Sequence, residues 1–321
     1  MARPLRFIPN EYLAWTDSYD RPIAVVEVTI RTILGMFLLT PTPKNKDLIV
    51  GVMAHVQERL KFDLYGYAWL SNHGSYLMGV TGPEHLAAIM REMHGQIARE
   101  IGRPECSDWS GAFWGRRGRA ILVADEAVQL ERLKYCLANS TKEHLVTRPT
   151  RWPGAHAAHA VCGSMVDTGI WIDRTRLDTM QRQKGSDYRR CLEACTDVVT
   201  LKLSKLPCLA HLTDFEYNQA MKALCREISE EATIERKATG ASVTGIKRLL
   251  RYSAHHKPDG IDKTPAPAVH CGCHAIRAAF KAAYGDFVNA YREASGELGK
   301  TVLTALFPTG GLPPGYCFEP S

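Results

Sequence analysis

The chain has 321 residues, of which 45% are hydrophobic and 23% charged, and its formal net charge is +6. This composition is typical of a globular protein and excludes a fibrous or low-complexity chain. No apolar run is long enough to span a bilayer, and the N-terminus has no apolar signal core, so we expect a cytoplasmic protein without a membrane partner. The ten cysteines are irregularly spaced, which favours reduced thiols over a disulfide framework. The positive charge favours a polyanionic ligand but does not establish one.

The first half of the chain alternates between strand and helix patterns. Apolar, β-rich stretches alternate with segments whose apolar residues recur every three or four positions. In chain order we expect strand over 24–40, helix over 47–60, two strands within 64–83, helix over 83–101, strand over 116–125 and helix over 126–139. This order predicts an α+β fold with a central antiparallel sheet.

The second half differs in character. Pro149 and Pro153 mark a boundary, so we expect one domain over 1–154 and a mostly α-helical accessory domain over 155–321. Thr213 and Glu216 are spaced as a capping box and predict the start of a long helix.

The stretch WLSNHGSYLMGV, residues 69–80, reads as a buried strand that contains a histidine. A lone histidine in such a strand is either a hydrogen-bonded core residue or a metal ligand. Residues two apart in a strand share a face, so His73 and position 75 would lie side by side. Position 75 is serine, which is a poor neutral ligand. Both interpretations of His73 therefore stay open.

A tyrosine and an amide lie four residues apart on the next expected helix. Tyr135 and Asn139 would share one face of that helix. An amphipathic tyrosine is the plain interpretation. A catalytic role requires the helix to pack against the strand of His73, because a tyrosine hydroxyl acts as a nucleophile only next to its phosphate.

An arginine-rich stretch follows a loop with several aromatic residues. Arg116, Arg117 and Arg119 lie near Trp109 and Trp114. Guanidinium groups bind phosphates and rings stack on bases, so this pattern suits single-stranded nucleic acid. A solvated loop is the alternative.

The sequence HCGCH at 270–274 gathers metal-ligand types within five residues. A structural zinc site usually has a CxxC-type pair and a second pair of ligands. Small residues at the start of a helix are the alternative, and the spacing favours them.

Several segments occur together in an order that resembles the REP-associated tyrosine transposases, a branch of the single-tyrosine HUH transposases. The matching pieces are MARPLR, AHVQERLKFDLYGYAWLSNHGSYLMGV, GRAILVADEAVQLERLKYCLANSTKEHLVTRPTRWPG, KTPAPAVH and FPTGGLPP. The first three cover most of residues 1–154, and the last two resemble longer members with a C-terminal extension. The resemblance implies the ferredoxin-like antiparallel sheet of HUH proteins, covered by helices, and a mostly helical C-terminal domain.

The resemblance also implies a site. The family motif Asn-His-x-His binds a divalent metal, Mg²⁺ or Mn²⁺, and a tyrosine on a later helix attacks the DNA phosphate with help from a polar amide. His73 matches the first histidine, Tyr135 the nucleophile and Asn139 the amide. Ser75 stands where the second histidine is expected, and the Asn-Pro-type stretch after the tyrosine helix is missing.

The implied function is DNA binding by a transposase-derived protein that recognises hairpin or single-stranded DNA. Arg116, Arg117, Arg119 and Trp114 are the expected DNA contacts. Because Ser75 replaces a ligand, we expect tyrosine-dependent cleavage to be impaired or lost, and a metal cofactor only if cleavage persists. Two alternatives stay open: an active single-tyrosine transposase that cuts and joins single-stranded DNA, and a non-enzymatic regulator or partner-binding protein. The oligomeric state is not predicted.

Overall fold

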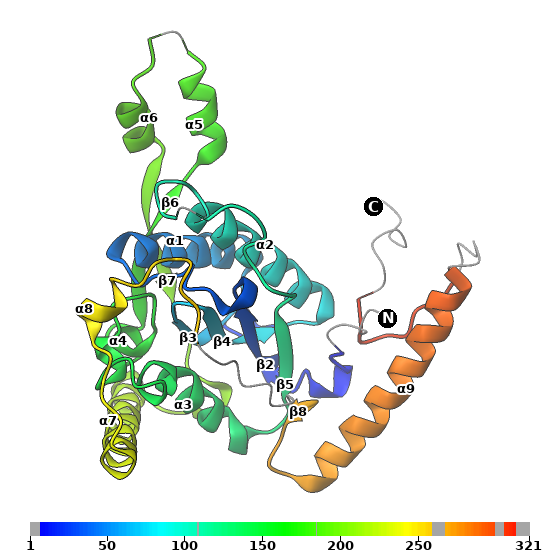
Figure 1. Cartoon of the computed structure of the whole chain (residues 1–321). Coiled ribbons are helices and arrows are strands. Elements are labelled where there is room, and N and C mark those ends of the chain that lie inside the picture. The colour runs from blue at the N-terminus through cyan, green and yellow to red at the C-terminus, as the bar shows by residue number, and fades with distance from the viewer. Residues whose placement is uncertain (1–6, 108, 184, 259–266, 299–304, 313–321) are drawn as a thin grey trace.

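The computed structural model describes most of the chain (Figure 1). The described residues are 7–107, 109–183, 185–258, 267–298 and 305–312. The opening segment MARPLR, at residues 1–6, lies outside them, as do parts of the segments KTPAPAVH and FPTGGLPP.

The central unit of the fold runs through six elements: β2 (Pro22–Arg31), α1 (Pro43–Leu60), β3 (Leu64–Trp69), β4 (His73–Val80), α2 (Pro83–Ile101) and β5 (Arg119–Val123). The strand order is β3-β4-β2-β5, and all neighbours in this order are antiparallel. A β-α-β-β-α-β succession with this pairing is the ferredoxin-like arrangement. The predicted α+β fold with a central antiparallel sheet is thus confirmed.

Local sequence signals begin and end these elements. The Thr42 hydroxyl accepts a hydrogen bond from the Asn45 amide, and Pro43 occupies the first turn, so α1 starts there. Lys61 adopts a left-handed conformation and ends α1 before β3. Pro83 likewise opens α2.

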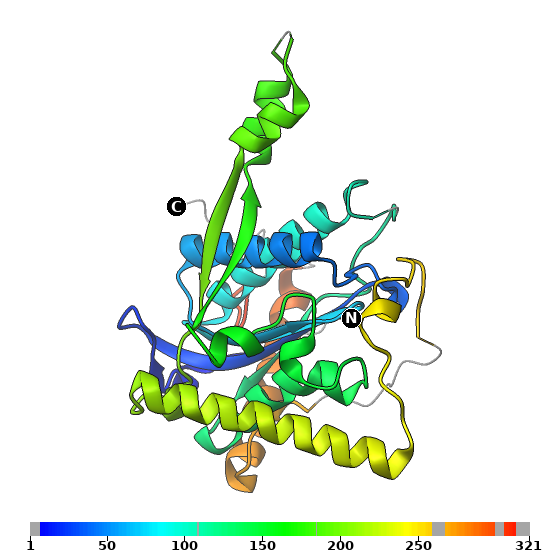
Figure 2. The ribbon, with the colours of Figure 1, turned by 90° about the vertical axis from the view of Figure 1, so that its left-hand side faces the viewer.

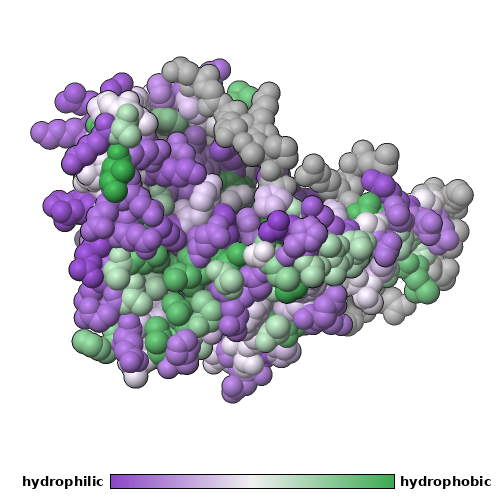
Figure 3. All heavy atoms as spheres, turned by 90° about the horizontal axis from the view of Figure 1, so that it is seen from below, coloured by the Kyte–Doolittle hydropathy of each residue, from purple (hydrophilic) through white to green (hydrophobic). Residues whose placement is uncertain are grey.

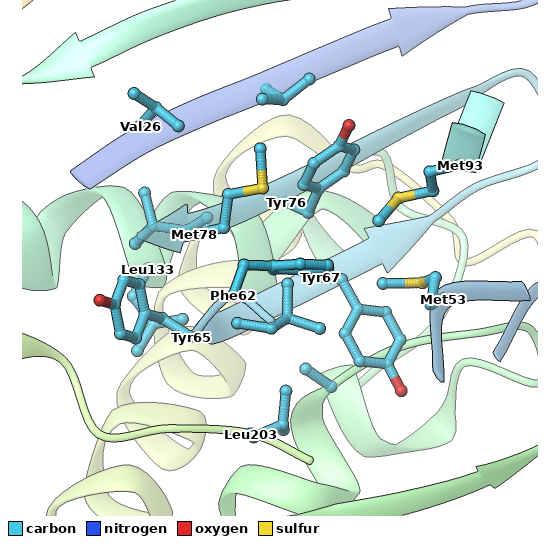
Figure 4. Packing of buried hydrophobic residues seen from close by; sticks show 14 of the residues in the cluster. Val26, Met53, Phe62, Tyr65, Tyr67, Tyr76, Met78, Met93, Leu133 and Leu203 are labelled. Carbon is cyan, nitrogen blue, oxygen red and sulfur yellow. The ribbon is translucent and has the colours of Figure 1, made fainter. Parts of the chain in front are cut away.

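The two faces of the sheet are covered by different helices. α1 and α2 cover one face, where the even-numbered residues of β2 and β4 meet large apolar side chains (Figure 4). Figure 4 shows Tyr67, Tyr76, Met78, Met53 and Met93 in this packing. α3 (Glu126–Lys142) covers the opposite face, where Leu133 packs against Gly66 of β3.

A hairpin arm extends away from the sheet and was not predicted from the sequence. Its strands β6 (Val166–Ile172) and β7 (Thr196–Lys202) pair antiparallel, and the helices α5 (Arg174–Gln181) and α6 (Tyr188–Ala194) lie at its outer end (Figure 2). Its base packs on α1, where Trp171 stacks on His55 with ring centroids 3.7 Å apart. The tip has a small core of its own, made of Leu177, Cys191 and Cys195.

The remaining C-terminal elements lie at different places around the sheet (Figure 1). α7 (Asp214–Thr239) packs along α3, and its predicted capping box is present, since Thr213 and Glu216 bond each other's backbone N–H groups. The short α8 (Ile246–Leu249) follows, and β8 (Val269–His270) adds to β5 in parallel before α9 (His274–Leu298). Smaller elements are β1 (Trp15–Thr16), α4 (Ala158–Val161) and the 3-10 helices Asn10–Tyr12, Ile33–Gly35, Pro149–Arg151 and Pro207–Leu209.

Both halves of the chain contribute to one main apolar cluster. It joins sheet residues such as Val28 to Leu203, Met221 and Phe280 from beyond position 154. Seen from below, the surface is mostly hydrophilic with a local group of apolar side chains (Figure 3). No helix within the described residues is long and apolar enough to cross a membrane.

Candidate functional site

The sheet face under α3 carries the predicted site. Residues paired across antiparallel strands point to the same face, and the register pairs Arg31 with His73 and Thr29 with Ser75. Thr29 also pairs with Arg119 of β5. Two rows of polar side chains therefore cross this face near one end of the sheet. One row contains His73 and Arg31, and the other contains Ser75, Thr29 and Arg119.

His73 lies at the start of β4 beside Asn72. Its Nδ1 is 2.7 Å from the Asn72 Oδ1 atom, so the residue before the histidine orients the ring. Burial, reinforced by the neighbouring Arg31 cation, lowers the pKa of His73 to about 4. The imidazole is neutral at physiological pH, as a metal ligand or a hydrogen-bonding group requires.

Ser75 is buried in the interior beneath α3. Its side chain is 1% exposed, and its Oγ has no hydrogen-bond partner among the described residues. The Cys136 thiol donates to the Ser75 carbonyl oxygen at 3.4 Å. Burial raises the pKa of that thiol to about 12, so it stays protonated. Position 75 is thus covered by α3, and Cys136 bonds to its backbone.

The helix with Tyr135 does pack against β3 and β4, as a catalytic role would require. Tyr135 itself lies on the flank of α3 and is 40% exposed. Its ring lies between the Arg132 guanidinium, 4.3 Å from the centroid, and the Lys142 ammonium, 5.0 Å from it. Asn139, one turn on, is only 7% exposed. The residue of α3 that bonds to Ser75 is therefore Cys136, whereas Tyr135 contacts Arg132 and Lys142.

A buried charge cluster on the same face was not predicted from the sequence. Glu27 of β2 forms a bidentate pair with Arg132, at 2.9 and 3.0 Å, and its Oε2 atom lies 2.7 Å from the His270 Nε2 atom. Burial alone would raise the pKa of Glu27, but hydrogen bonds from His270 and Arg132 lower it instead. The only sequence signal was a glutamate in an otherwise apolar strand. Arg132 thereby links this cluster to the Tyr135 ring.

The predicted DNA-contacting residues lie at the same end of the sheet as His73. The Gly115 N–H donates to the Arg31 carbonyl at 3.0 Å, and the exposed Arg116 and Arg117 follow directly. Trp114 is half-buried, and its indole N–H donates to the His94 carbonyl at 2.9 Å. The arginines thus face solvent near the site, whereas the Trp114 ring is partly used in packing.

The residues around His73 do not fit a divalent cation. The described residues contain no group of three or more His, Cys, Asp and Glu side chains that could hold a metal ion. The side chains that β2 places next to His73 and Ser75 are Arg31, a cation, and Thr29. The Cys136 thiol is protonated and engaged. We therefore derive no catalytic step through a metal.

The segment HCGCH forms a turn that bonds to the N-terminus of α3. Asp125, the N-cap residue of α3, accepts hydrogen bonds from the Cys271 thiol at 2.9 Å and the Gly272 N–H at 2.7 Å. Burial and the Asp125 carboxylate raise the pKa of Cys271 to about 11, so the thiolate that zinc prefers is disfavoured. These contacts fit the alternative interpretation, in which Cys271 to Cys273 are small residues that precede α9 and do not bind zinc.

No family model and no curated protein matches the sequence. Among solved structures, the chain is similar to a REP-associated tyrosine transposase bound to a REP hairpin, with a TM-score of 0.39 and 15% identity over 50% of this chain and 85% of that one. It is also similar to a protein assigned as a transposase from Deinococcus radiodurans, with a TM-score of 0.27 and 16% identity over 35% of this chain and 88% of that one. Both likenesses are partial, so the interpretation of the site depends on the residues of this chain.

Proposed function

We propose that this chain is a transposase-derived DNA-binding protein that recognises hairpin or single-stranded DNA and in which cleavage by Tyr135 is impaired or lost. The observation that carries the proposal is the burial of Ser75 under α3. The Ser75 hydroxyl is buried without a hydrogen-bond partner among the described residues, and the Cys136 thiol of α3 donates to the Ser75 backbone carbonyl, so α3 lies directly against this position. The strand, the helix and their order fit the implied site, but the donor set does not.

DNA binding is supported by the charges at the same end of the sheet. Arg116 and Arg117 are exposed, and Arg119 lies in the cross-strand row of Ser75 and Thr29. Such a group binds phosphates through charge and does not need a working nucleophile. A protein that has lost cleavage can therefore retain its DNA affinity.

The test of binding is the salt dependence of affinity for a hairpin oligonucleotide with an unpaired flank. The triple variant Arg116→Ala, Arg117→Ala, Arg119→Ala should bind more weakly across sequences. For this variant, the slope of log affinity against log salt concentration should fall in magnitude by about 0.7 for each single-strand phosphate that is no longer neutralised. The control is Arg182→Ala, Arg189→Ala, Arg190→Ala on the outer end of the arm, which removes the same charge. An unchanged slope in the first variant contradicts the proposed surface, and absence of binding favours the non-enzymatic partner-binding alternative.

The test of cleavage is capture of a covalent protein–DNA adduct with Mn²⁺ or Mg²⁺ present. We expect little or no adduct from the unmodified chain. A full-rate adduct that Tyr135→Phe abolishes would instead support the active transposase, because phenylalanine lacks the attacking oxygen.

A further inference from the structure

A pocket of about 350 Å³ lies between the His73 end of the sheet and the segment 244–258, which includes α8. This volume falls within the range of small-ligand sites. Arg31, Asn72 and His73 line one side, and Tyr252 and His256 line the other. The pocket is therefore formed jointly by the sheet and by a segment far along the chain.

One wall of the pocket is aromatic. The rings of Tyr252 and His256 are stacked, with centroids 4.4 Å apart and planes 16° apart. Phe37 meets both rings edge-on at 5.4 and 4.9 Å, and its N–H donates to the His256 carbonyl at 2.9 Å. These contacts hold the wall in place, and such a wall suits a flat heteroaromatic ring.

The opposite wall is polar. Within the described part of the chain, Arg31 makes no ion pair, so its charge is available to an anion. The Ser71 hydroxyl also lines the pocket and is buried with no hydrogen-bond partner among the described residues. Asn72 and the neutral His73 ring add neutral polar groups, and Glu143 adds an acceptor. A ligand with a phosphate and a polar ring matches this combination.

We propose that this pocket binds one unpaired nucleotide, with its base against the wall of Tyr252, His256 and Phe37 and its phosphate at Arg31. For a nucleotide within a DNA strand, the inference depends on the proposed function. The strand would leave the pocket toward Arg116 and Arg117, because Gly115 bonds to Arg31 and the ring of Trp109 lies 5.7 Å from that of His255. A free nucleoside monophosphate has the same chemistry, so the two sources must be tested separately.

The experiment uses the full chain and a hairpin oligonucleotide in which 2-aminopurine replaces each base of the unpaired flank in turn. We expect protection from acrylamide quenching at one flank position. Tyr252→Ala should weaken binding of the flanked hairpin about tenfold or more, since the base can no longer stack on an aromatic ring, whereas Tyr252→Phe retains the ring and the affinity. Arg31→Gln should also weaken DNA binding. The slope of log affinity against log salt concentration should fall in magnitude by about 0.7, the value for one single-strand phosphate. Tyr188→Ala, on the arm, is the matched control.

The outcomes separate this inference from the proposed function. DNA binding without a protected position, and without an effect of Tyr252→Ala or Arg31→Gln, overturns the pocket and leaves the function standing. Binding of dAMP that depends on Tyr252 and Arg31, without any DNA binding, supports the pocket for free nucleotides and overturns the proposed function. Failure to bind either probe overturns the pocket. The protection pattern is measured on the unmodified chain, so the result does not depend on the folding of a variant.

Discussion

The two faces of the central sheet differ in what their helices bury. Under α1 and α2, the even-numbered residues of β2 and β4 meet aromatic and aliphatic side chains (Figure 4). Under α3, the odd-numbered positions include Glu27, His73 and Ser75. Buried polar groups are costly unless they are paired, and the Ser75 hydroxyl has no partner among the described residues. The first face has the composition of a packing surface, whereas the second gathers buried polar side chains.

The largest expected effect tests the charge cluster under α3. Glu27→Gln removes the carboxylate that the largely buried Arg132 guanidinium binds through two hydrogen bonds, so the unfolding free energy should fall by about 3–5 kcal/mol. Urea denaturation with constant m-value measures this loss. Adding Arg132→Met should recover part of it, since the unpaired charge is then removed. A loss below about 1 kcal/mol in Glu27→Gln would mean that the cluster is solvated like a surface pair.

Ser75→His tests whether the position can still hold a ligand. Ser75 is buried under α3, whose Cys136 thiol bonds to the Ser75 carbonyl, so overpacking should cost about 1–3 kcal/mol, and Cys136→Ala in the same background should relieve part of this cost. If the new imidazole meets His73, Mn²⁺ should raise the thermal midpoint of the variant but not of the unmodified chain. A covalent DNA adduct should then appear and should vanish with Tyr135→Phe. A folded variant without metal stabilisation would show that more than one residue of the site has changed.

The order of elements could be predicted from the sequence, but the site could only be predicted in part. Period-two and period-3.6 patterns are local, so the run from β2 to α3 followed from the chain alone. The orientation of α3 is not local: its packing decides that Cys136, and not Tyr135, meets Ser75. The pairing of Glu27 with His270 joins residues at opposite ends of the sequence, and the hairpin arm depends on its base packing against α1. The boundary near 154 remains a prediction, although both halves share one apolar cluster.

A pH dependence should distinguish the buried His156 from the half-buried His73. Burial lowers the pKa of both His73 and His156 from 6.5 to about 4. Between these values the unfolded chain binds more protons, so stability is fully present above pH 6.5 and is lost as the pH falls through 4. His156→Gln should therefore reduce the loss of stability between pH 7 and pH 5 by about 2 kcal/mol. His73→Gln should reduce it less, because His73 lines an open pocket. An equal acid sensitivity in the His156 variant would contradict this assignment.

The smallest expected effect lies on the outer side of α3. Lys134 donates to Glu227 at 2.8 Å and to Glu231 at 2.6 Å, and both carboxylates belong to the exposed side of α7. Surface ion pairs contribute little because water and salt screen them, so Lys134→Met should cost less than about 1 kcal/mol and should lose its effect at high salt. Urea denaturation at low and high ionic strength checks this. A large, salt-independent loss would mean that α7 depends on this contact to stay on α3. The charges outside α3 would then be as important for stability as those beneath it.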